Sequence, residues 1–163
     1  MWLNDETFRC VVASTPLVSI DLVVQNEVGE VLLGRRLNRP AQGFWFVPGG
    51  RIQKNETFDA AFRRLTLAEL GSDFEHSSAS LLGAYEHFYS DSVFGASEES
   101  IDTHYVVLGY HLLLPIGHTL TLPSDQHSAY RWWSISEIEA SAEVHANSRV
   151  YMNALRMYMC EGK

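Results

Sequence analysis

Runs and alternations of apolar residues along the chain predict a series of strands. The segment 17–24, LVSIDLVV, is almost continuously aliphatic and β-branched, which is typical of a strand buried on both faces. Turn residues at 27–30 separate it from 31–35, which we expect to return as its hairpin partner. The same pattern predicts further strands over 44–47, 81–89, 104–114 and 130–134.

Apolar residues recur with helical spacing in three other segments. Within 56–70, Phe58, Phe62 and Leu65 fall on one face, and Gly71 marks the C-terminal end. Residues 4–13 read as a short amphipathic helix, and residues 147–159 as a terminal helix. Hairpins combined with one crossover helix predict an α/β (α+β) fold, a mixed sheet between helices. We expect a single domain over 1–163.

Composition narrows the class of protein. Of the 163 residues, 46% are hydrophobic and 12% aromatic, which is ample for a folded core. No apolar run approaches the roughly 20 residues that a bilayer span needs, so no membrane association is expected. Cys10 and Cys160 lie near opposite ends without metal-ligand spacing, and the acidic start lacks the basic stretch of a signal peptide. Both features indicate a cytoplasmic protein with reduced thiols.

The charge is unevenly distributed. The formal net charge of −8 argues against nucleic acid as a partner. Residues 35–64, however, contain seven Lys or Arg against two acids, a net of +5, while the rest of the chain carries −13. Such a cationic island predicts a compact anionic ligand such as a phosphate. A solvated helix face together with loop charges would give the same count.

A glycine turn followed by a helix carries the candidate chemistry. Gly49 and Gly50 let a ligand approach the backbone closely, and the helix behind them carries carboxylates near its start and its end. Such a unit can hold a divalent cation against a diphosphate. Its spacing resembles the Nudix hydrolase signature, G-x5-E-x7-R-E-U-x-E-E-x-G-U, in which U is a bulky aliphatic residue. The matching positions are Gly50, Glu56, Arg64, Glu69 and Gly71.

The chain departs from this signature at three positions. Leu65 and Ala68 stand where the signature has glutamates, and Ser72 replaces its closing aliphatic residue. Since positions 65, 68 and 69 share one helix face, the usual carboxylate cluster is reduced to Glu69. One carboxylate is insufficient for two or three ions. We therefore expect one Mg²⁺ per subunit, with Mn²⁺ as the alternative, and a general base elsewhere.

Longer stretches resemble one Nudix subfamily, the GDP-mannose mannosyl hydrolases. They are STPLVS (14–19), LLGRR (32–36), NRPAQGFWFVPGGR (38–51), RLTLAELG (64–71), THYVVLG (103–109) and HANSR (145–149). The resemblance implies a homodimer that cleaves the C1–O bond of GDP-mannose, and also GDP-glucose, with inversion. Two alternatives stay open: a Nudix pyrophosphohydrolase that cleaves a P–O bond of another nucleotide sugar, and a non-catalytic nucleotide-sugar sensor. Leu65 and Ala68 weigh against the first, and the retained site residues against the second.

The resemblance also implies the metal ligands and the general base. The ligands would be the carbonyl of Gly49, the carboxylate of Glu69 and the amide oxygen of Gln126, all hard oxygen donors. The base would be His127, in the loop 123–127, because a neutral imidazole can accept a proton from water at pH 7. Without the resemblance, a loop histidine is usually a solvated bystander.

Three arginines are implied on the diphosphate side. Arg36 aligns with the diphosphate-binding arginine of the subfamily, with Arg51 and Arg64 as helpers. Arg64 has an alternative role, which is to orient the helix glutamates. We expect Glu56 to hold the junction between loop and helix through backbone amides.

The sugar and the base of the nucleotide complete the implied site. Asp21 and Tyr105 join Arg36 and His127 in the expected catalytic set, and His87 lies beside them on the sugar side. Asp21 is the strongest of these, because a carboxylate in a buried strand is costly without a partner, although a bond to nearby backbone would also satisfy it. On the nucleotide side the aligned residues are Trp2, Leu3 and Phe8. Packing on the core or on a neighbouring subunit is their alternative role.

Overall fold

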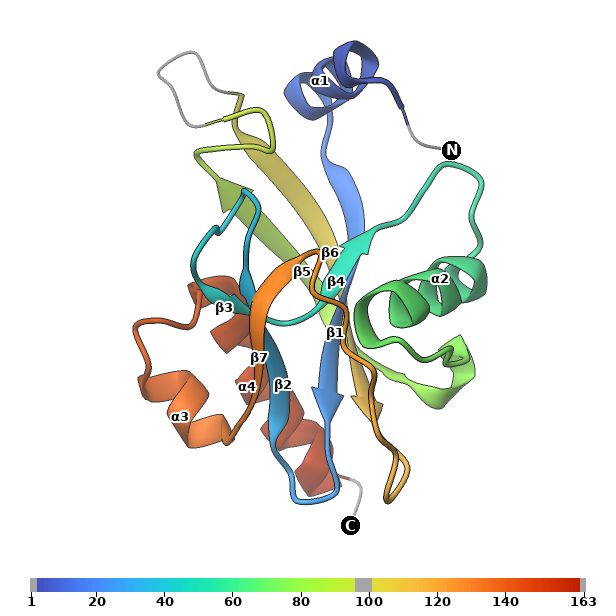
Figure 1. Ribbon diagram of the computed structural model, residues 1–163, viewed down its shortest axis with the longest axis vertical. Coiled ribbons are helices and arrows are strands. Elements are labelled where there is room, and N and C mark those ends of the chain that lie inside the picture. The colour runs from blue at the N-terminus through green and yellow to red at the C-terminus, as the bar shows by residue number, and fades with distance from the viewer. Residues whose placement is uncertain (1–2, 96–100, 162–163) are drawn as a thin grey trace.

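Strand β1 (Leu17–Gln25) is the centre of the sheet in the computed structural model, which describes residues 3–95 and 101–161 (Figure 1). Its main neighbours give the order β3-β2-β1-β6-β5, while β4 also pairs with β1 and β7 with β2. β1 runs parallel to β6, and every other pairing is antiparallel. The remaining strands are β2 (Val31–Arg36), β3 (Trp45–Phe46), β4 (Gly49–Arg51), β5 (Ser80–Tyr89), β6 (Thr103–Leu113) and β7 (His127–Trp133).

Helices cover both faces of this mixed sheet. α2 (Phe58–Leu70) lies on one side in Figure 1, while α3 (Ile135–Ala140) and α4 (Ala146–Glu161) lie on the other. Two buried clusters follow from this arrangement. One packs Phe62 of α2 on Ile20 and Leu22 of β1, and the other packs the apolar face of α4 on the opposite face of the sheet. The predicted mixed sheet between helices is therefore confirmed.

Local signals explain where the helices begin and end. The Asn4 side chain accepts a hydrogen bond from the Thr7 amide and caps α1 (Asp5–Ser14). Thr57 caps α2 in the same way, and Gly71 ends α2 with φ of 67°, a left-handed conformation that favours glycine. A short 3-10 helix, η1 (His76–Ser78), follows. None of the helices within 3–95 and 101–161 combines the length and the apolar character needed to cross a membrane.

The structure differs from the predicted elements at three places. The strand expected over 44–47 is shorter, β3 at Trp45–Phe46, and the glycine turn expected after it is instead a strand, β4, because Gly49–Arg51 pairs with β1. The strand expected over 130–134 begins at His127, since His127 pairs with Arg36 across an irregularity in β2. α3 was not expected from the apolar pattern, and its capping box, Ser134 with Glu137, is its sequence signal.

Candidate active site

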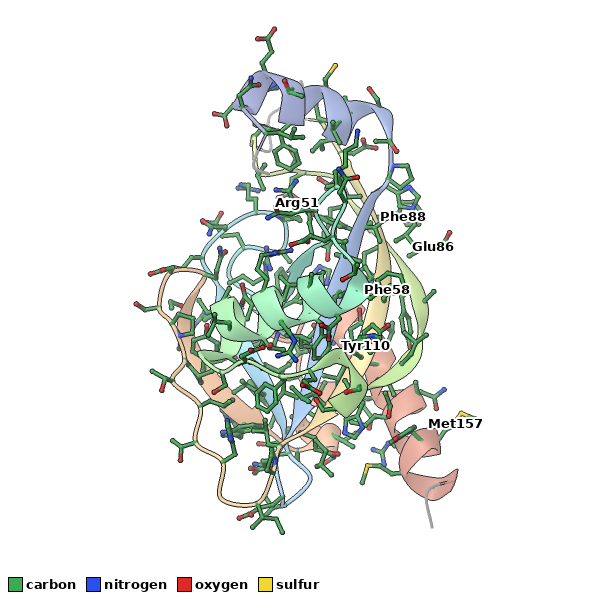
Figure 2. All side chains as sticks on the ribbon, turned by 90° about the vertical axis from the view of Figure 1, so that its right-hand side faces the viewer. Arg51, Phe58, Glu86, Phe88, Tyr110 and Met157 are labelled. Carbon is green, nitrogen blue, oxygen red and sulfur yellow. The ribbon has the colours of Figure 1, made fainter. Side chains whose placement is uncertain are left out.

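A cavity of about 700 Å³ opens between α1, α2 and the strands β1, β4, β5 and β6. This volume is in the range of small-molecule sites. Figure 2 shows Arg51, one of the residues that line this cavity, beneath α1. Most of the residues implied from sequence meet here, namely Leu3, Asp21, Arg36, Gly49, Arg51, Arg64, Glu69, His87, Tyr105 and Gln126. Phe8 and His127 are not on the cavity wall, and Trp2 lies outside the described residues.

Gly49 presents its carbonyl away from the neighbouring strand. The Leu22 amide donates to the Pro48 carbonyl at 2.8 Å, and the Ile52 amide donates to the Val18 carbonyl at 2.9 Å. Gly49 faces Asp21 in the same antiparallel register. Since hydrogen-bonded and non-hydrogen-bonded pairs alternate, the Gly49–Asp21 pair is a non-hydrogen-bonded one. The Gly49 carbonyl is therefore not used by this ladder.

Glu69 has the properties of a metal ligand. Its Oε2 is buried and has no hydrogen-bond partner among the described residues. Burial raises the pKa of Glu69 to about 7, and the positive charge of Arg36 partly opposes this shift. A buried carboxylate without a partner is costly, and a divalent cation would compensate it. Gly49, Glu69 and Gln126 line the same cavity and carry oxygen donors of the kind that such an ion takes, and the Gln126 amide oxygen accepts a hydrogen bond from Asn38 Nδ2 at 3.3 Å.

His127 is a buried strand residue, so its expected place in a loop is wrong. It pairs with Arg36 as the first residue of β7 and is 2% exposed. A Cβ at Gly34 would come within 2.4 Å of its Cδ2, so the glycine makes room for the ring. His127 Nδ1 lies 3.9 Å from Glu69 Oε2. The residue is thus next to the candidate metal ligand but behind the cavity wall.

The protons around His127 can be assigned. The Tyr130 hydroxyl donates to the Pro123 carbonyl at 2.8 Å and lies 3.0 Å from His127 Nδ1. Because the hydroxyl proton is used, Nδ1 must carry the proton and donate to the Tyr130 oxygen. Nε2 then holds the lone pair, and it is buried without a hydrogen-bond partner among the described residues. Burial and the charge of Arg36 lower the pKa of His127 to about 4, so the ring is neutral at pH 7.

Arg36 is the central cation of the cavity. Its Nε donates to the Pro40 carbonyl at 2.9 Å, and its guanidinium lies 5.6 Å from the centre of the Phe46 ring. Its charge lowers the pKa values of both Asp21 and Glu69. This fixed positive charge between two carboxylates suits an anionic group of a ligand.

Two other basic residues of the 35–64 island, Arg63 and Arg64, form ion pairs with acidic side chains. Arg63 contacts Asp59, Asp73 and Glu75 on the surface. These contacts fit the alternative in which the basic residues belong to a solvated helix face. Arg64 binds both oxygens of Glu56, with Nε at 2.6 Å and Nη2 at 2.8 Å. These contacts favour the alternative in which Arg64 orients a glutamate of the motif, here Glu56.

Glu56 and Arg64 together hold the turn that follows β4. Arg64 Nη2 donates to the Arg51 carbonyl at 2.8 Å, and the Gln53 amide donates to Glu56 Oε2 at 2.7 Å. The pair thus fixes the backbone on both sides of the turn. The backbone contact expected for Glu56 is present, and the Arg64 ion pair is its larger interaction.

Asp21 lies at the opposite side of the cavity from α2. It is 7% exposed, and burial raises its pKa to about 7 while the bond from Tyr151 and the charge of Arg36 oppose the shift. The Tyr151 hydroxyl donates to Asp21 Oδ2 at 2.7 Å, so its partner is a distant side chain and not nearby backbone. His87 is 3% exposed and its Nδ1 lies 4.0 Å from the same oxygen. Tyr105 also lines this side, and burial raises its pKa.

Two residues on this side were not predicted from the sequence, Tyr151 and Tyr89. Tyr151 falls in the apolar stripe of α4 and is 0% exposed. A buried tyrosine hydroxyl needs a hydrogen-bond partner, and so does a buried carboxylate such as Asp21, which has no partner within its own strand. These two needs were the signal in the sequence that could have paired the residues. Tyr89 at the end of β5 also lines the cavity, and burial raises its pKa strongly.

The N-terminal helix closes one end of the cavity. Leu3, Thr7 and Val11 line it, while the Phe8 ring lies 3.9 Å from the guanidinium of Arg51 and 5.5 Å from the ring of Phe94. The aromatic face of Phe8 is therefore occupied by an arginine. Its contact with a nucleotide stays a prediction.

Comparisons with solved structures identify the class of fold. The chain resembles the MutT protein of Methanosarcina mazei with a TM-score of 0.66 at 19% identity, covering 92% of this chain and 98% of that one. It resembles the NUDIX domain of Shewanella oneidensis NrtR, solved with ADP ribose, with a TM-score of 0.67 at 17% identity, covering 96% and 94%. The fold and site thus define an α+β domain of the Nudix type.

Sequence comparison identifies the family. Residues 15–155 match the NUDIX domain family, and the chain therefore belongs to the Nudix hydrolases, which generally use divalent metal ions. It is also 46% identical, over 113 residues, to a Haloferax volcanii protein named low-salt glycan biosynthesis protein Agl8, covering 69% of this chain and 68% of that protein. The expected membership of the Nudix family is confirmed.

Proposed function

We propose that this protein hydrolyses GDP-mannose to GDP and mannose, by attack of water at the sugar C1 with inversion. The observation that carries the proposal is the set of side chains that α2 presents to the cavity. Leu65, Ala68 and Glu69 line the cavity together, so this face offers one carboxylate between apolar side chains. The usual Nudix carboxylate cluster, which supports cleavage of a P–O bond, lacks two of its acids here. Departure of GDP from C1 needs charge neutralisation at the diphosphate and a separate base.

Different residues of the cavity would bind different parts of the substrate. Arg36 and Arg51 would bind the diphosphate, and Asp21, His87 and Tyr105 would receive the sugar. Gly49, Glu69 and Gln126 would hold one Mg²⁺ or Mn²⁺. When bound, that ion supplies positive charge that stabilises the GDP leaving group.

His127 is the proposed general base, through Nε2. Its low pKa keeps this nitrogen unprotonated at pH 7, as a base requires. Because the side chain is 2% exposed, Nε2 must become accessible to water before it can act as the base.

Other expectations from sequence belong to the same proposal. The name of the Haloferax volcanii relative refers to glycan biosynthesis, which supports a nucleotide sugar as substrate. GDP-glucose as a second substrate, a homodimeric state and a cytoplasmic location stay predictions of the subfamily resemblance.

The test is hydrolysis of GDP-mannose with Mg²⁺ in ¹⁸O-labelled water. We expect label in mannose, unlabelled GDP, and a first-formed anomer opposite to that of the substrate. Mannose 1-phosphate with GMP would instead establish the pyrophosphohydrolase. Binding of GDP-mannose without turnover would establish the sensor. The Glu69→Gln variant is the matched control, since it keeps the side-chain shape and removes the charge.

A further inference from the structure

Asp21 occupies a position in the sheet where both neighbouring strands carry glycine. In register, Gly49 of β4 lies on one side of Asp21 and Gly109 of β6 on the other. A Cβ at position 49 would lie 2.8 Å from Asp21 Oδ1, and a Cβ at position 109 would lie 2.8 Å from Tyr151 Cε1. Real side chains do not approach this closely, so both positions require glycine. The two glycines open the space in which a carboxylate and a tyrosine ring meet.

Tyr151 reaches this space from α4, on the face of the sheet opposite to α2. It belongs to α4, is 0% exposed, and packs edge-on against Tyr85 with ring centres 4.7 Å apart. Its hydroxyl donates to Asp21 Oδ2 at 2.7 Å. This bond is charge-assisted when Asp21 is ionised, and such bonds are the stronger kind. The hydroxyl therefore fixes one of the two oxygens of a carboxylate that borders the cavity.

The same hydroxyl also contacts His87. The Tyr151 oxygen lies 3.3 Å from His87 Nε2. Since the single hydroxyl proton is directed to Asp21, Nε2 must carry a proton and donate it to the tyrosine oxygen. Burial lowers the pKa of His87 to about 4, so only one of its nitrogens is protonated at pH 7. Nδ1 is then left as an acceptor beside the cavity.

We propose that Tyr151 is a positioning residue for the sugar side of the active site. It holds the Asp21 carboxylate in place and selects the His87 tautomer whose Nδ1 accepts a hydrogen bond. Two acceptors, one from each side chain, then face the sugar and suit its hydroxyl groups, which are donors. This inference rests on the proposed function for the identity of the ligand. The arrangement of Tyr151, Asp21 and His87 does not depend on that identity.

The test is Tyr151→Phe, which keeps the ring and removes the hydroxyl. Calorimetry would measure the affinities of GDP-mannose and GDP, with Mg²⁺ present. We expect the preference for GDP-mannose over GDP to fall about tenfold, as for a lost hydrogen bond to a charged group, while the GDP affinity stays within about twofold. We also expect kcat/KM for GDP-mannose to fall at least as much as the preference. The matched control is Tyr158→Phe, which removes a hydroxyl of the same helix that bonds Ser80 Oγ at 2.7 Å.

A second measurement needs no substrate. The ¹⁵N chemical shifts of the His87 ring, assigned with His87→Gln, report which nitrogen carries the proton. We expect the Nε2–H form in the unaltered protein and in Tyr158→Phe, and a mixture of tautomers in Tyr151→Phe.

The outcomes separate this inference from the proposed function. An unchanged preference for GDP-mannose in Tyr151→Phe, or equal losses of GDP and GDP-mannose affinity, would overturn the positioning role. An unchanged His87 tautomer would do the same. If the unaltered protein neither prefers nor cleaves GDP-mannose, the proposed function fails, and the tautomer measurement alone decides whether Tyr151 sets the state of His87.

Discussion

Replacing Glu56 by glutamine should destabilise the protein through the turn after β4. Glu56 receives three hydrogen bonds, two from Arg64 at 2.6 and 2.8 Å and one from the Gln53 amide at 2.7 Å. Hydrogen bonds to charged groups contribute about 1.5–3 kcal/mol each, and a glutamine oxygen keeps part of them. We therefore expect the free energy of unfolding to fall by about 2 kcal/mol at pH 7. For a chain of this size, Tm should fall by about 4–8 °C.

The stability contributed by Glu56 should depend on pH in a defined direction. The bond from Arg64 is the main cause that lowers the pKa of Glu56 below its ordinary 4.5. The folded protein thus binds this proton less readily than the unfolded chain does, and the stability contributed by Glu56 is present above pH 4.5. That contribution is lost as the pH falls through the lowered folded pKa. Urea unfolding at several pH values should therefore show the difference between the two proteins shrinking below pH 4.5.

The chain supplies a matched control for Glu56→Gln. Glu139 binds Arg156 through both oxygens, at 3.3 and 2.7 Å, but these side chains are 43% and 51% exposed. The side chains of Glu56 and Arg64 are 18% and 31% exposed. Since exposed ion pairs contribute little, Glu139→Gln should be close to neutral. Equal effects of the two substitutions, or a Glu56→Gln effect that does not change with pH, would refute the reasoning.

Three further predictions concern the proposed base, the proposed metal ligand and the N-terminal helix. His127→Gln should lower kcat for GDP-mannose at least 100-fold while the affinity stays within a fewfold, as for loss of a general base, measured by steady-state kinetics and calorimetry. Glu69→Gln should weaken Mn²⁺ binding at least tenfold, since it removes the charged ligand, measured by electron paramagnetic resonance of free Mn²⁺. Phe8→Ala should lose about 1 kcal/mol of stability, since it removes the cation–π contact of 3.9 Å with Arg51, measured by urea unfolding.

Each of these has a result that contradicts it. Unchanged turnover in His127→Gln would remove this residue from the mechanism. Unchanged Mn²⁺ affinity in Glu69→Gln would place the ion elsewhere. A stability of Phe8→Ala equal to that of the unaltered protein would show that the Arg51 contact does not hold α1.

Features encoded by neighbouring residues could be predicted from sequence, and features that depend on distant pairing could not. β1 and α2 carry their periodicity and end signals within their own segments, so both were predicted to within a few residues. The start of β7 depends on pairing with Arg36, some ninety residues earlier, and no local pattern reports it. The burial of His127 depends on the same pairing and on the space at Gly34.

The candidate site also combines residues that could be predicted from sequence with contacts that could not. The subfamily resemblance implied Gly49, Glu69 and Gln126 as metal ligands, and these three residues do line one cavity. The partner of Asp21 could not be read from sequence, because helical periodicity marks Tyr151 as buried without showing what its hydroxyl meets. The role of Arg64 was left between two alternatives, and only the side-chain geometry favours one of them.

The glycines on either side of Asp21 also affect the unfolded chain. A glycine within a strand costs about 0.5–1 kcal/mol relative to alanine, because it loses more conformational entropy when the chain folds. Gly49 and Gly109 together therefore lower the stability of the protein by about 1–2 kcal/mol. An engineer who replaced them by alanine to recover that entropy would place a Cβ 2.4 Å from the Ile20 carbonyl or 2.8 Å from Tyr151. Alanine at either position would therefore strain the folded sheet or displace Tyr151, so the entropic cost of these two glycines cannot be recovered by substitution.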